Sequence, residues 1–157
     1  MPVVLCRIDD RLLHGQVVIG WGQPLGAEFI VVVDDQVRHS TWEQDLYRMG
    51  VPPQIEVRFA GIEEARAGWP SWSADRRRGF VLTGDISTMV ALRAQGAALE
   101  RVVVGGIHHR PGRTERLPYV YLSDAELTEL RALAKAGVDV VAQDLPTTSP
   151  VPLERLG

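Results

Sequence analysis

Cysteine and lysine are almost absent from this 157-residue sequence, which contains one of each, Cys6 and Lys135. A single cysteine excludes a disulfide within the chain and a metal site built from several cysteines. We expect Cys6 to pack as a small apolar residue in the first strand, because free cysteine is among the most buried residue types. Apart from Lys135, every permanently charged basic side chain is an arginine, whose guanidinium group suits phosphate and carboxylate partners.

Long apolar runs and an excess of positive charge are also missing. No run is long enough to cross a bilayer, and the start "MPVVLCRIDD" lacks the basic and apolar parts of a signal peptide. We therefore expect a cytoplasmic protein.

The formal net charge of -3 argues against a nucleic-acid partner, which would require a broad cationic surface. With 45% hydrophobic residues and no repeat or linker, the chain is expected to form one domain over residues 1–157.

Short apolar segments rich in β-branched residues recur along the chain. They predict strands over residues 3–8, 29–34, 55–59, 80–83, 101–106, 119–122 and 138–143. Several are apolar without alternation, which is typical of parallel strands covered by helices on both faces. The predicted fold class is therefore α/β, with three α/β/α layers around an open, mostly parallel twisted sheet of six or seven strands.

Helix signals occur between these segments. A serine or threonine followed three residues later by glutamine or glutamate forms a capping box, and this pattern at Thr41 and at Ser123 predicts helices over 41–50 and 123–137. Residues 66–79, "RAGWPSWSADRRRG", are predicted to form an exposed connection. In open α/β sheets, ligands bind beyond the carboxyl ends of the strands. The candidate site therefore comprises the turns 9–15, 34–39, 83–88, 105–113 and 143–149.

The first of these turns places one histidine among charged side chains, in "CRIDDRLLHGQV" (6–17). If residues 3–8 form a strand, His14 lies near the start of a helix, where unpaired main-chain N–H groups attract an anion. A histidine there is disfavoured from carrying its own positive charge and can act as a neutral nucleophile. Such an imidazole can accept a phosphoryl group, with Gly15 and Gln16 at the helix start and Arg11 available to bind the phosphate.

The two aspartates of this turn need separate roles. One can hold the far ring nitrogen of the histidine and fix its tautomer, and Asp10 is preferred for a role facing the site, although Asp9 fits the pattern as well. The same residues also fit a purely structural turn. In that alternative, the aspartates cap the helix and form ion pairs with Arg7 and Arg11.

Two later turns are further candidates. In "VLTGDISTM" (81–89), Thr83, Gly84 and Asp85 can approach the same phosphate, or Asp85 can simply cap the following helix. In "GGIHHRPGR" (105–113), the two glycines permit close approach of a partner or substrate, and two arginines provide a rim that attracts anions; these residues are Gly105, Gly106, Arg110 and Arg113. The adjacent histidines 108 and 109 do not have the spacing of metal ligands, so no metal site is predicted.

The motif "RIDDRLLHGQV", followed by Trp21, resembles the phosphohistidine signature of the IIB components of the mannose/fructose/sorbose family of the bacterial phosphoenolpyruvate-dependent sugar phosphotransferase system. The resemblance continues through "IVVVDDQV" (30–37), "VPPQIEV" (51–57) and "VVVGGIHHRPGR" (102–113), and so covers nearly the whole chain. It implies an open α/β fold.

This resemblance also implies an activity, that of a protein-Npi-phosphohistidine–sugar phosphotransferase. The IIA protein or domain would pass a phosphoryl group to Nδ1 of His14, and the sugar would receive it through the membrane components IIC and IID. Arg7, Asp10 and Arg11 would orient the histidine and neutralise the phosphate. No cofactor is implied, peripheral association with IIC and IID is expected, and a homo-oligomer is compatible with the sequence.

Three other functions were compared with this interpretation. A response-regulator receiver domain requires an aspartate after a middle strand and a lysine after a late one, but "IEVRFAG" (55–61) has no aspartate at its end and Lys135 lies within a predicted helix. Dinucleotide binding is disfavoured because no GxGxxG follows a strand. The remaining alternative is a regulatory or sugar-sensing relative that keeps the fold without serving transport.

Overall fold

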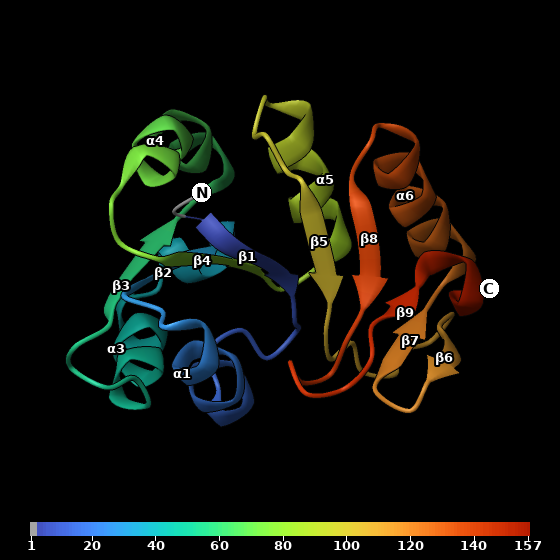
Figure 1. Ribbon diagram of the computed structural model, residues 1–157, viewed down its shortest axis with the longest axis horizontal. Coiled ribbons are helices and arrows are strands. Elements are labelled where there is room, and N and C mark those ends of the chain that lie inside the picture. Colours follow the sequence, from blue (N-terminus) through green and yellow to red (C-terminus); the bar gives the residue numbers. More distant parts are fainter. Residues whose placement is uncertain (1–2) are drawn as a thin grey trace.

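The computed structural model describes residues 3–157, and a seven-stranded sheet forms its centre (Figure 1). The strand order is β3-β2-β4-β1-β5-β8-β9, with every neighbouring pair parallel except β8 and β9. The strands are β1 (Val3–Ile8), β2 (Phe29–Val33), β3 (Glu56–Ala60), β4 (Gly79–Thr83), β5 (Arg101–Val104), β8 (Asp139–Ala142) and β9 (Val151–Pro152).

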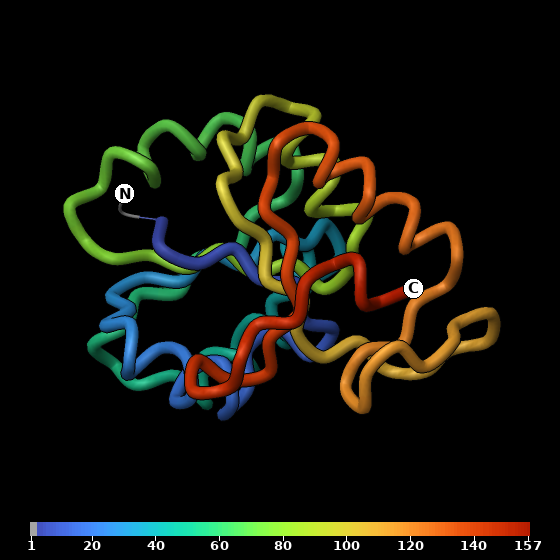
Figure 2. Tube along the Cα trace, turned by 45° about the vertical axis from the view of Figure 1, so that its right-hand side comes forward, coloured from blue at the N-terminus to red at the C-terminus, as the bar shows by residue number. Residues whose placement is uncertain are grey.

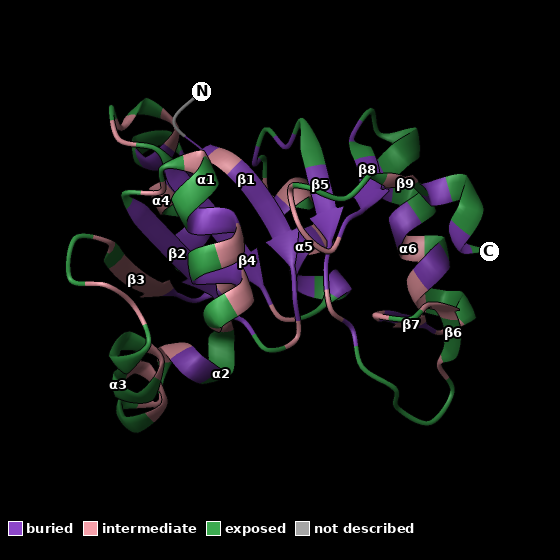
Figure 3. Ribbon diagram, turned by 60° about the horizontal axis from the view of Figure 1, so that its bottom comes forward, coloured by how far each residue is buried: buried purple, intermediate pink, exposed green. Residues whose placement is uncertain are grey.

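Helices cover both faces of this sheet, which confirms the predicted three-layer α/β/α fold (Figure 1). One face carries η1 (Gln16–Trp21), which is π-helical, α1 (Gly22–Leu25), α2 (Asp35–Arg38) and α3 (Thr41–Met49). The other face carries α4 (Ile62–Ala74), α5 (Ile86–Ala94) and α6 (Asp124–Lys135), and the chain ends in a 3-10 turn, η2 (Leu153–Leu156). Buried residues concentrate in the central strands between these layers (Figure 3).

Strand β1 lies between β4 and β5, and this position determines where the candidate turns meet. Its last residue, Ile8, pairs with Thr83 of β4 on one side and with Val104 of β5 on the other. The turns that follow these three strands therefore leave the sheet side by side. The connections from these neighbouring strands leave on opposite faces of the sheet, which makes this place a topological switch point. Open α/β sheets bind ligands at such points.

The predicted strand over 119–122 is present but lies outside the main sheet. Strand β7 (Val120–Leu122) pairs antiparallel with β6 (Thr114–Leu117) in a separate two-stranded unit. Figure 2 shows the orange segment that contains them lying apart from the sheet strands. A tight turn joins Leu117 to Val120, and the other edge of β7 bonds only to Ile107, just after β5. The seventh strand of the main sheet is β9 instead.

The prediction that residues 66–79 form an exposed connection is wrong. Most of this segment belongs to α4, which continues through Pro70, and only residues 75–78 connect it to β4. Trp69 and Trp72 anchor the helix because both rings are buried against the sheet. Burial of two large aromatic side chains outweighs the local helix-breaking effect of the proline.

The two predicted capping boxes have different outcomes. At Ser123 the box is confirmed, since Ser123 Oγ accepts from the main-chain N–H of Glu126 (3.1 Å) and Glu126 Oε1 accepts from that of Ser123 (2.9 Å). At Thr41 it is wrong, because α3 begins one residue earlier, with Ser40 in the N-cap position and no side-chain cap, and Gln44 turns back to donate to the carbonyl oxygens of α2. The short connection between α2 and α3 makes these carbonyls the nearer acceptors.

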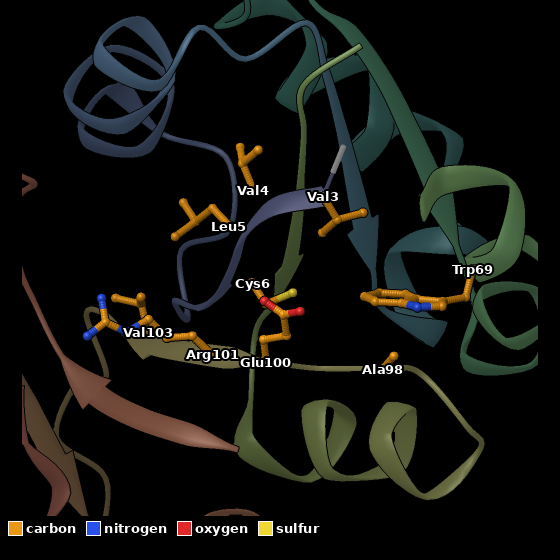
Figure 4. A pocket seen from close by; sticks show the side chains of 9 residues that line it. All are labelled: Val3, Val4, Leu5, Cys6, Trp69, Ala98, Glu100, Arg101 and Val103. Atoms are coloured by element: carbon orange, nitrogen blue, oxygen red, sulfur yellow. The ribbon is translucent and has the colours of Figure 1, made fainter. Parts of the chain in front are cut away.

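Cys6 is buried in β1 as expected, and burial raises the pKa of its thiol to about 12. It lines a cavity of about 300 Å³ between the amino-terminal parts of β1 and β5, together with Trp69 (Figure 4). This cavity exists because the two strands pair only near their carboxyl ends, at Arg7 and Ile8 of β1. It therefore lies at the end of the strands opposite to the candidate turns.

No helix among residues 3–157 combines the length and the apolar character that crossing a membrane requires.

Candidate active site

Asp9 is the centre of the charged turn after β1. Its side chain is 1% exposed, and its carboxylate lies 3.1 Å from Nε2 of His14 and 3.5 Å from Nη2 of Arg7. The same carboxylate accepts main-chain N–H groups of Arg11 (3.1 Å) and Gly106 (3.4 Å). Burial alone would raise the pKa of Asp9, but the contacts with His14, Arg11 and Arg7 together hold it below its ordinary value. Asp9 is therefore a buried anion with several stabilising partners.

His14 is held from two directions. Its carbonyl oxygen accepts from Val17 and Val18 at the start of the helical segment, which fixes the main chain. Its side chain, 15% exposed, directs Nε2 towards Asp9. Nε2 does not reach hydrogen-bond geometry with the carboxylate, but the negative charge 3.1 Å away favours the tautomer with hydrogen on Nε2. Nδ1 is then the ring nitrogen that keeps its lone pair.

Arg7 supports Asp9 from within the core. Its side chain is fully buried, Nη1 donates to the carbonyl of Gln143 (2.7 Å), and the guanidinium lies over the ring of Trp21, 4.9 Å from the centroid. Burial lowers the pKa of Arg7, and the nearby carboxylate of Asp9 opposes this shift. A Cβ at Gly105 would overlap the Arg7 guanidinium, so glycine is required there. The predicted contact between Arg7 and a phosphate conflicts with this burial.

The aspartate that contacts His14 is Asp9, and the prediction that favoured Asp10 is wrong. The main-chain N–H of Asp9 still bonds to Thr83 of β4, so the strand geometry continues one residue past Ile8. Alternation then places Arg7 and Asp9 on the same face of the sheet. Asp10 points elsewhere, and its carboxylate contacts His108.

Arg11, Gly15 and Gln16 are near His14 in sequence, and their contact with a phosphate stays a prediction. Arg11 is exposed and its Nη2 donates to Oε1 of Gln16 (3.3 Å). Gly15 is also exposed, and a Cβ there would meet nothing within 4 Å, so the space beside the helix start is open. Arg11 is the only lysine or arginine between residues 9 and 16. It therefore provides the positive charge nearest in sequence to an anion bound here.

The turn after β4 lies against this loop but uses its side chains structurally. Thr83 is buried and its Oγ1 donates to the carbonyl of Asp85 (3.0 Å), while Asp85 caps α5 by accepting from Thr88 (2.7 Å). Gly84 faces Leu12, with about 3.5 Å between an added Cβ and the leucine side chain. The side chain of Asp85 therefore caps the following helix, which was the alternative to approaching a phosphate. Contact of this turn with phosphate stays a prediction.

The loop 105–113 lies beside the loop that follows β1 and bonds to it. Gly105 donates to Ile8 (2.7 Å), and Gly106 accepts from the main chain of Asp10 (2.9 Å). Arg110 and Arg113 reach an open cleft of about 310 Å³ shared with the first loop. Its other lining residues come from the loop after β1, from α2 and the residue before it, from α3 and from the turn after β4; they are Asp10, Leu12, Asp34, Gln36, Val37, Glu43, Tyr47, Gly84 and Asp85.

Asp144 is a structural partner that the sequence pattern did not predict. Its carbonyl accepts from Trp21 (2.9 Å), Gln16 (3.0 Å) and Arg7 (3.3 Å), and its carboxylate also contacts Gln16. The one available signal was its place in the turn 143–149 at the same end of the sheet. Within residues 3–157, no three histidine, cysteine, aspartate or glutamate side chains gather as metal ligands would.

This geometry suits transfer of an anionic group to His14. Asp9 orients the ring and can stabilise the positive charge that develops when Nδ1 forms a bond to an electrophile. The open helix start and the exposed Arg11 offer N–H donors and a cation on the outside of the loop. Arg7, fully buried, keeps the aspartate charged without occupying that space.

Comparisons with known proteins identify the family. The family described as "PTS system sorbose subfamily IIB component" matches residues 3–156. The N-acetylgalactosamine-specific phosphotransferase enzyme IIB component 1 of Escherichia coli (strain K12) is 35% identical, over 92% of this chain and 91% of its own. The crystal structure of the IIBSor domain of the sorbose permease from Klebsiella pneumoniae is similar with a TM-score of 0.90 and 28% identity, covering 99% of this chain and 96% of that one.

A third relative is the mannose-specific EIIAB component of Escherichia coli (strain K12), which is 25% identical over 94% of this chain but only 46% of its own length.

Proposed function

Because this chain belongs to the sorbose-subfamily IIB components of the phosphotransferase system (PTS), a family of phosphoryl carriers for sugar uptake, we propose that it carries the phosphoryl group on Nδ1 of His14. The observation that supports this assignment most directly is the 3.1 Å contact between Asp9 and Nε2 of the same ring. That contact leaves Nδ1 as the nucleophilic nitrogen.

The transfer step follows from these positions. The lone pair of Nδ1 attacks the phosphorus of a phosphohistidine on the donor, the donor's N–P bond breaks, and its imidazole leaves with the bonding electrons. Nε2 of His14 keeps its hydrogen, so the phosphorylated ring carries a positive charge that the carboxylate of Asp9 stabilises. This positive charge also keeps the ring a good leaving group for the next transfer.

The phosphate itself needs partners outside the ring. We assign Arg11 to neutralise it, and the main-chain N–H groups of Gly15 and Gln16 to bind it, because they lie at the start of the helical segment where such groups lack helical acceptors. Thr83, Gly84 and Asp85 can contribute through their main chain. Arg7 acts on the phosphate only through Asp9.

The partners follow from the family. The donor is a IIA protein or domain, and a sugar that enters through the membrane components IIC and IID receives the group. The name of the EIIAB relative, and the match of this chain to less than half of it, support a IIA donor. We further propose that residues 1–157 act as one domain in the cytoplasm, associated peripherally with IIC and IID, and that Arg110 and Arg113 lie on the rim that faces a partner.

Incubation with a phosphorylated IIA protein that is active on another IIB component tests this proposal. The wild-type chain is expected to gain an acid-labile, base-stable phosphate that peptide mapping places on His14. His14→Ala should gain none, whereas His39→Ala, which removes an exposed histidine at the end of α2, should match the wild type. Label on an aspartate, or none from the active donor, would refute the assignment.

A further inference from the structure

A second histidine is joined to the acceptor loop by contacts that the transfer step does not use. The main-chain N–H of His108 donates to Oδ2 of Asp10 (2.7 Å), and Nδ1 of its ring lies 2.7 Å from Oδ1 of the same carboxylate. Both oxygens of Asp10 are therefore engaged by one residue. The side chain of Asp10 is 12% exposed and that of His108 is 64% exposed.

The ring contact determines where a proton lies. A carboxylate at this distance only accepts hydrogen bonds, so Nδ1 of His108 must carry a hydrogen, either as the Nδ1–H tautomer or as the imidazolium. The two consecutive aspartates thus bind two histidines through different ring nitrogens, Asp9 at Nε2 of His14 and Asp10 at Nδ1 of His108.

His108 is itself anchored through its main-chain carbonyl. Arg113 donates from Nη1 to the carbonyl of His108 (2.9 Å) and forms two parallel bonds to Glu126, from Nε (2.9 Å) and Nη2 (2.8 Å). Burial alone would raise the pKa of Glu126, but the bonds from Arg113 and Ser123 hold it below its ordinary value. Since Glu126 also closes the capping box at Ser123, the loop is fixed to the first turn of α6.

The contacts between the two loops lie next to the reacting histidine. The main-chain N–H of Asp10 donates to Gly106 (2.9 Å), and that of Gly106 approaches Asp9 (3.4 Å). A displacement of Asp10 would therefore also displace Asp9, which orients the ring of His14. Shifts of less than 1 Å in a group that orients a nucleophile lower transfer rates substantially.

We propose that His108 is a positioning residue for phosphoryl transfer, which holds the acceptor loop to α6 through its contact with Asp10. This inference rests on the proposed function, because it takes His14 as the acceptor. His108 contacts neither the reacting nitrogen nor the phosphate in this arrangement and acts only through Asp10.

The test compares initial rates of His14 phosphorylation by phospho-IIA over a range of donor concentrations. We expect His108→Ala to lower kcat about ten-fold, the typical effect of losing one hydrogen bond to a charged group, and to change KM for the donor less than two-fold. His108→Asn should recover at least half of the loss, since its amide N–H can replace Nδ1–H. His109→Ala, which removes the adjacent exposed ring, should match the wild type.

A double-variant cycle tests whether the effect passes through Asp10. If it does, the double variant Asp10→Asn/His108→Ala is no slower than Asp10→Asn alone. Melting temperatures verify folding, and the exposure of the His108 side chain makes the Ala variant compatible with the fold.

Several results would overturn the inference: an unchanged kcat in His108→Ala, a change confined to KM, an Asn variant as slow as the Ala variant, or additive effects in the cycle. A wild-type chain without phosphate on His14 would instead refute the proposed function and remove the basis of this inference with it. Phosphoramidate, a small phosphoryl donor, gives an independent measure. It should also react about ten-fold more slowly with His108→Ala, because positioning of His14 does not depend on donor docking.

Discussion

At the scale of single residues, the proposed role of His14 depends most on Asp9. It is buried, it contacts His14 and Arg7, and it accepts from two main-chain N–H groups. The sequence "IDDR" identified an aspartate in this role but could not distinguish Asp9 from Asp10. The distinction depends on how far the strand geometry of β1 continues, because alternation decides which side chain shares a face with Arg7.

Asp9→Asn tests this role. The amide keeps the size of the side chain but removes the charge that stabilises a phosphorylated ring and the preference for hydrogen on Nε2. We expect the rate of His14 phosphorylation to fall by about 10²- to 10⁴-fold, the range for loss of the carboxylate that orients a reacting histidine. Quench-flow labelling, with circular dichroism to measure the folded fraction, checks the prediction. A wild-type rate in the folded variant would show that Asp9 does not orient the ring.

At the scale of secondary-structure elements, α6 holds the loop 105–113 in place. Its first turn contains the capping box of Ser123 and Glu126, and Leu127, Leu130 and Leu133 bury one side of the helix. The start of α6 therefore contributes both to stability and to the position of Arg113.

Ser123→Ala should lower the free energy of unfolding by about 0.5–2 kcal/mol, since it leaves the Glu126 main-chain N–H without its side-chain acceptor. Urea denaturation measures the change. Thr128→Ala, at an exposed position further along the same helix, serves as the control and should stay within about 0.5 kcal/mol of the wild type. Equal losses in both variants would mean that the cap contributes nothing specific.

The elements also show how much of the fold could be predicted from sequence. The core strands were predicted almost to the residue, because runs such as "FIVVV" in β2 are completely buried and carry an unambiguous pattern. Helix α4 was missed since Pro70 and neighbouring polar residues are local signals, whereas the burial of Trp69 and Trp72 depends on the sheet beneath them. The pairing of β7 with β6 likewise depends on a turn whose geometry no periodicity reveals.

The same difference between local patterns and tertiary packing applies to the candidate site. His14 and its loop were predicted from a dense local motif, and the strand order then brought the turns after β4 and β5 beside it. The roles of Asp144 and His108 could not be predicted, because their partners lie about 100 residues or more away in the chain. Contacts of this kind follow from tertiary packing alone.

At the scale of the whole molecule, ion pairs connect the end of α4 to β3, at the edge of the sheet. Arg77 bonds to Asp75 at the end of α4 (2.9 Å) and to Glu56 in β3 (3.2 Å). Hydrogen bonds from the side chain and main chain of Arg77 lower the pKa of Asp75 to about 2. Because folding lowers this pKa, the ion pair stabilises the folded chain above the ordinary pKa of aspartate, and that contribution is lost as the pH falls towards 2.

The difference in urea midpoint between the wild type and Asp75→Asn should therefore be constant near neutral pH and shrink as the pH falls from about 4 to 2. An NMR titration of the Asp75 carboxyl carbon should give a midpoint near pH 2, and Arg77→Gln should move it towards the ordinary value near 3.9. A midpoint near 3.9 in the wild type would contradict the ion pair.

The proposed carrier function depends on one bond, between phosphorus and Nδ1 of His14. The most direct measurement is heteronuclear NMR of the phosphorylated protein labelled with ¹⁵N in its histidine rings, which identifies the nitrogen that carries the phosphate. We predict phosphorus coupling at Nδ1 of His14 and a retained hydrogen on Nε2, the nitrogen beside Asp9. Phosphate on Nε2, on another histidine or on an aspartate would contradict the account.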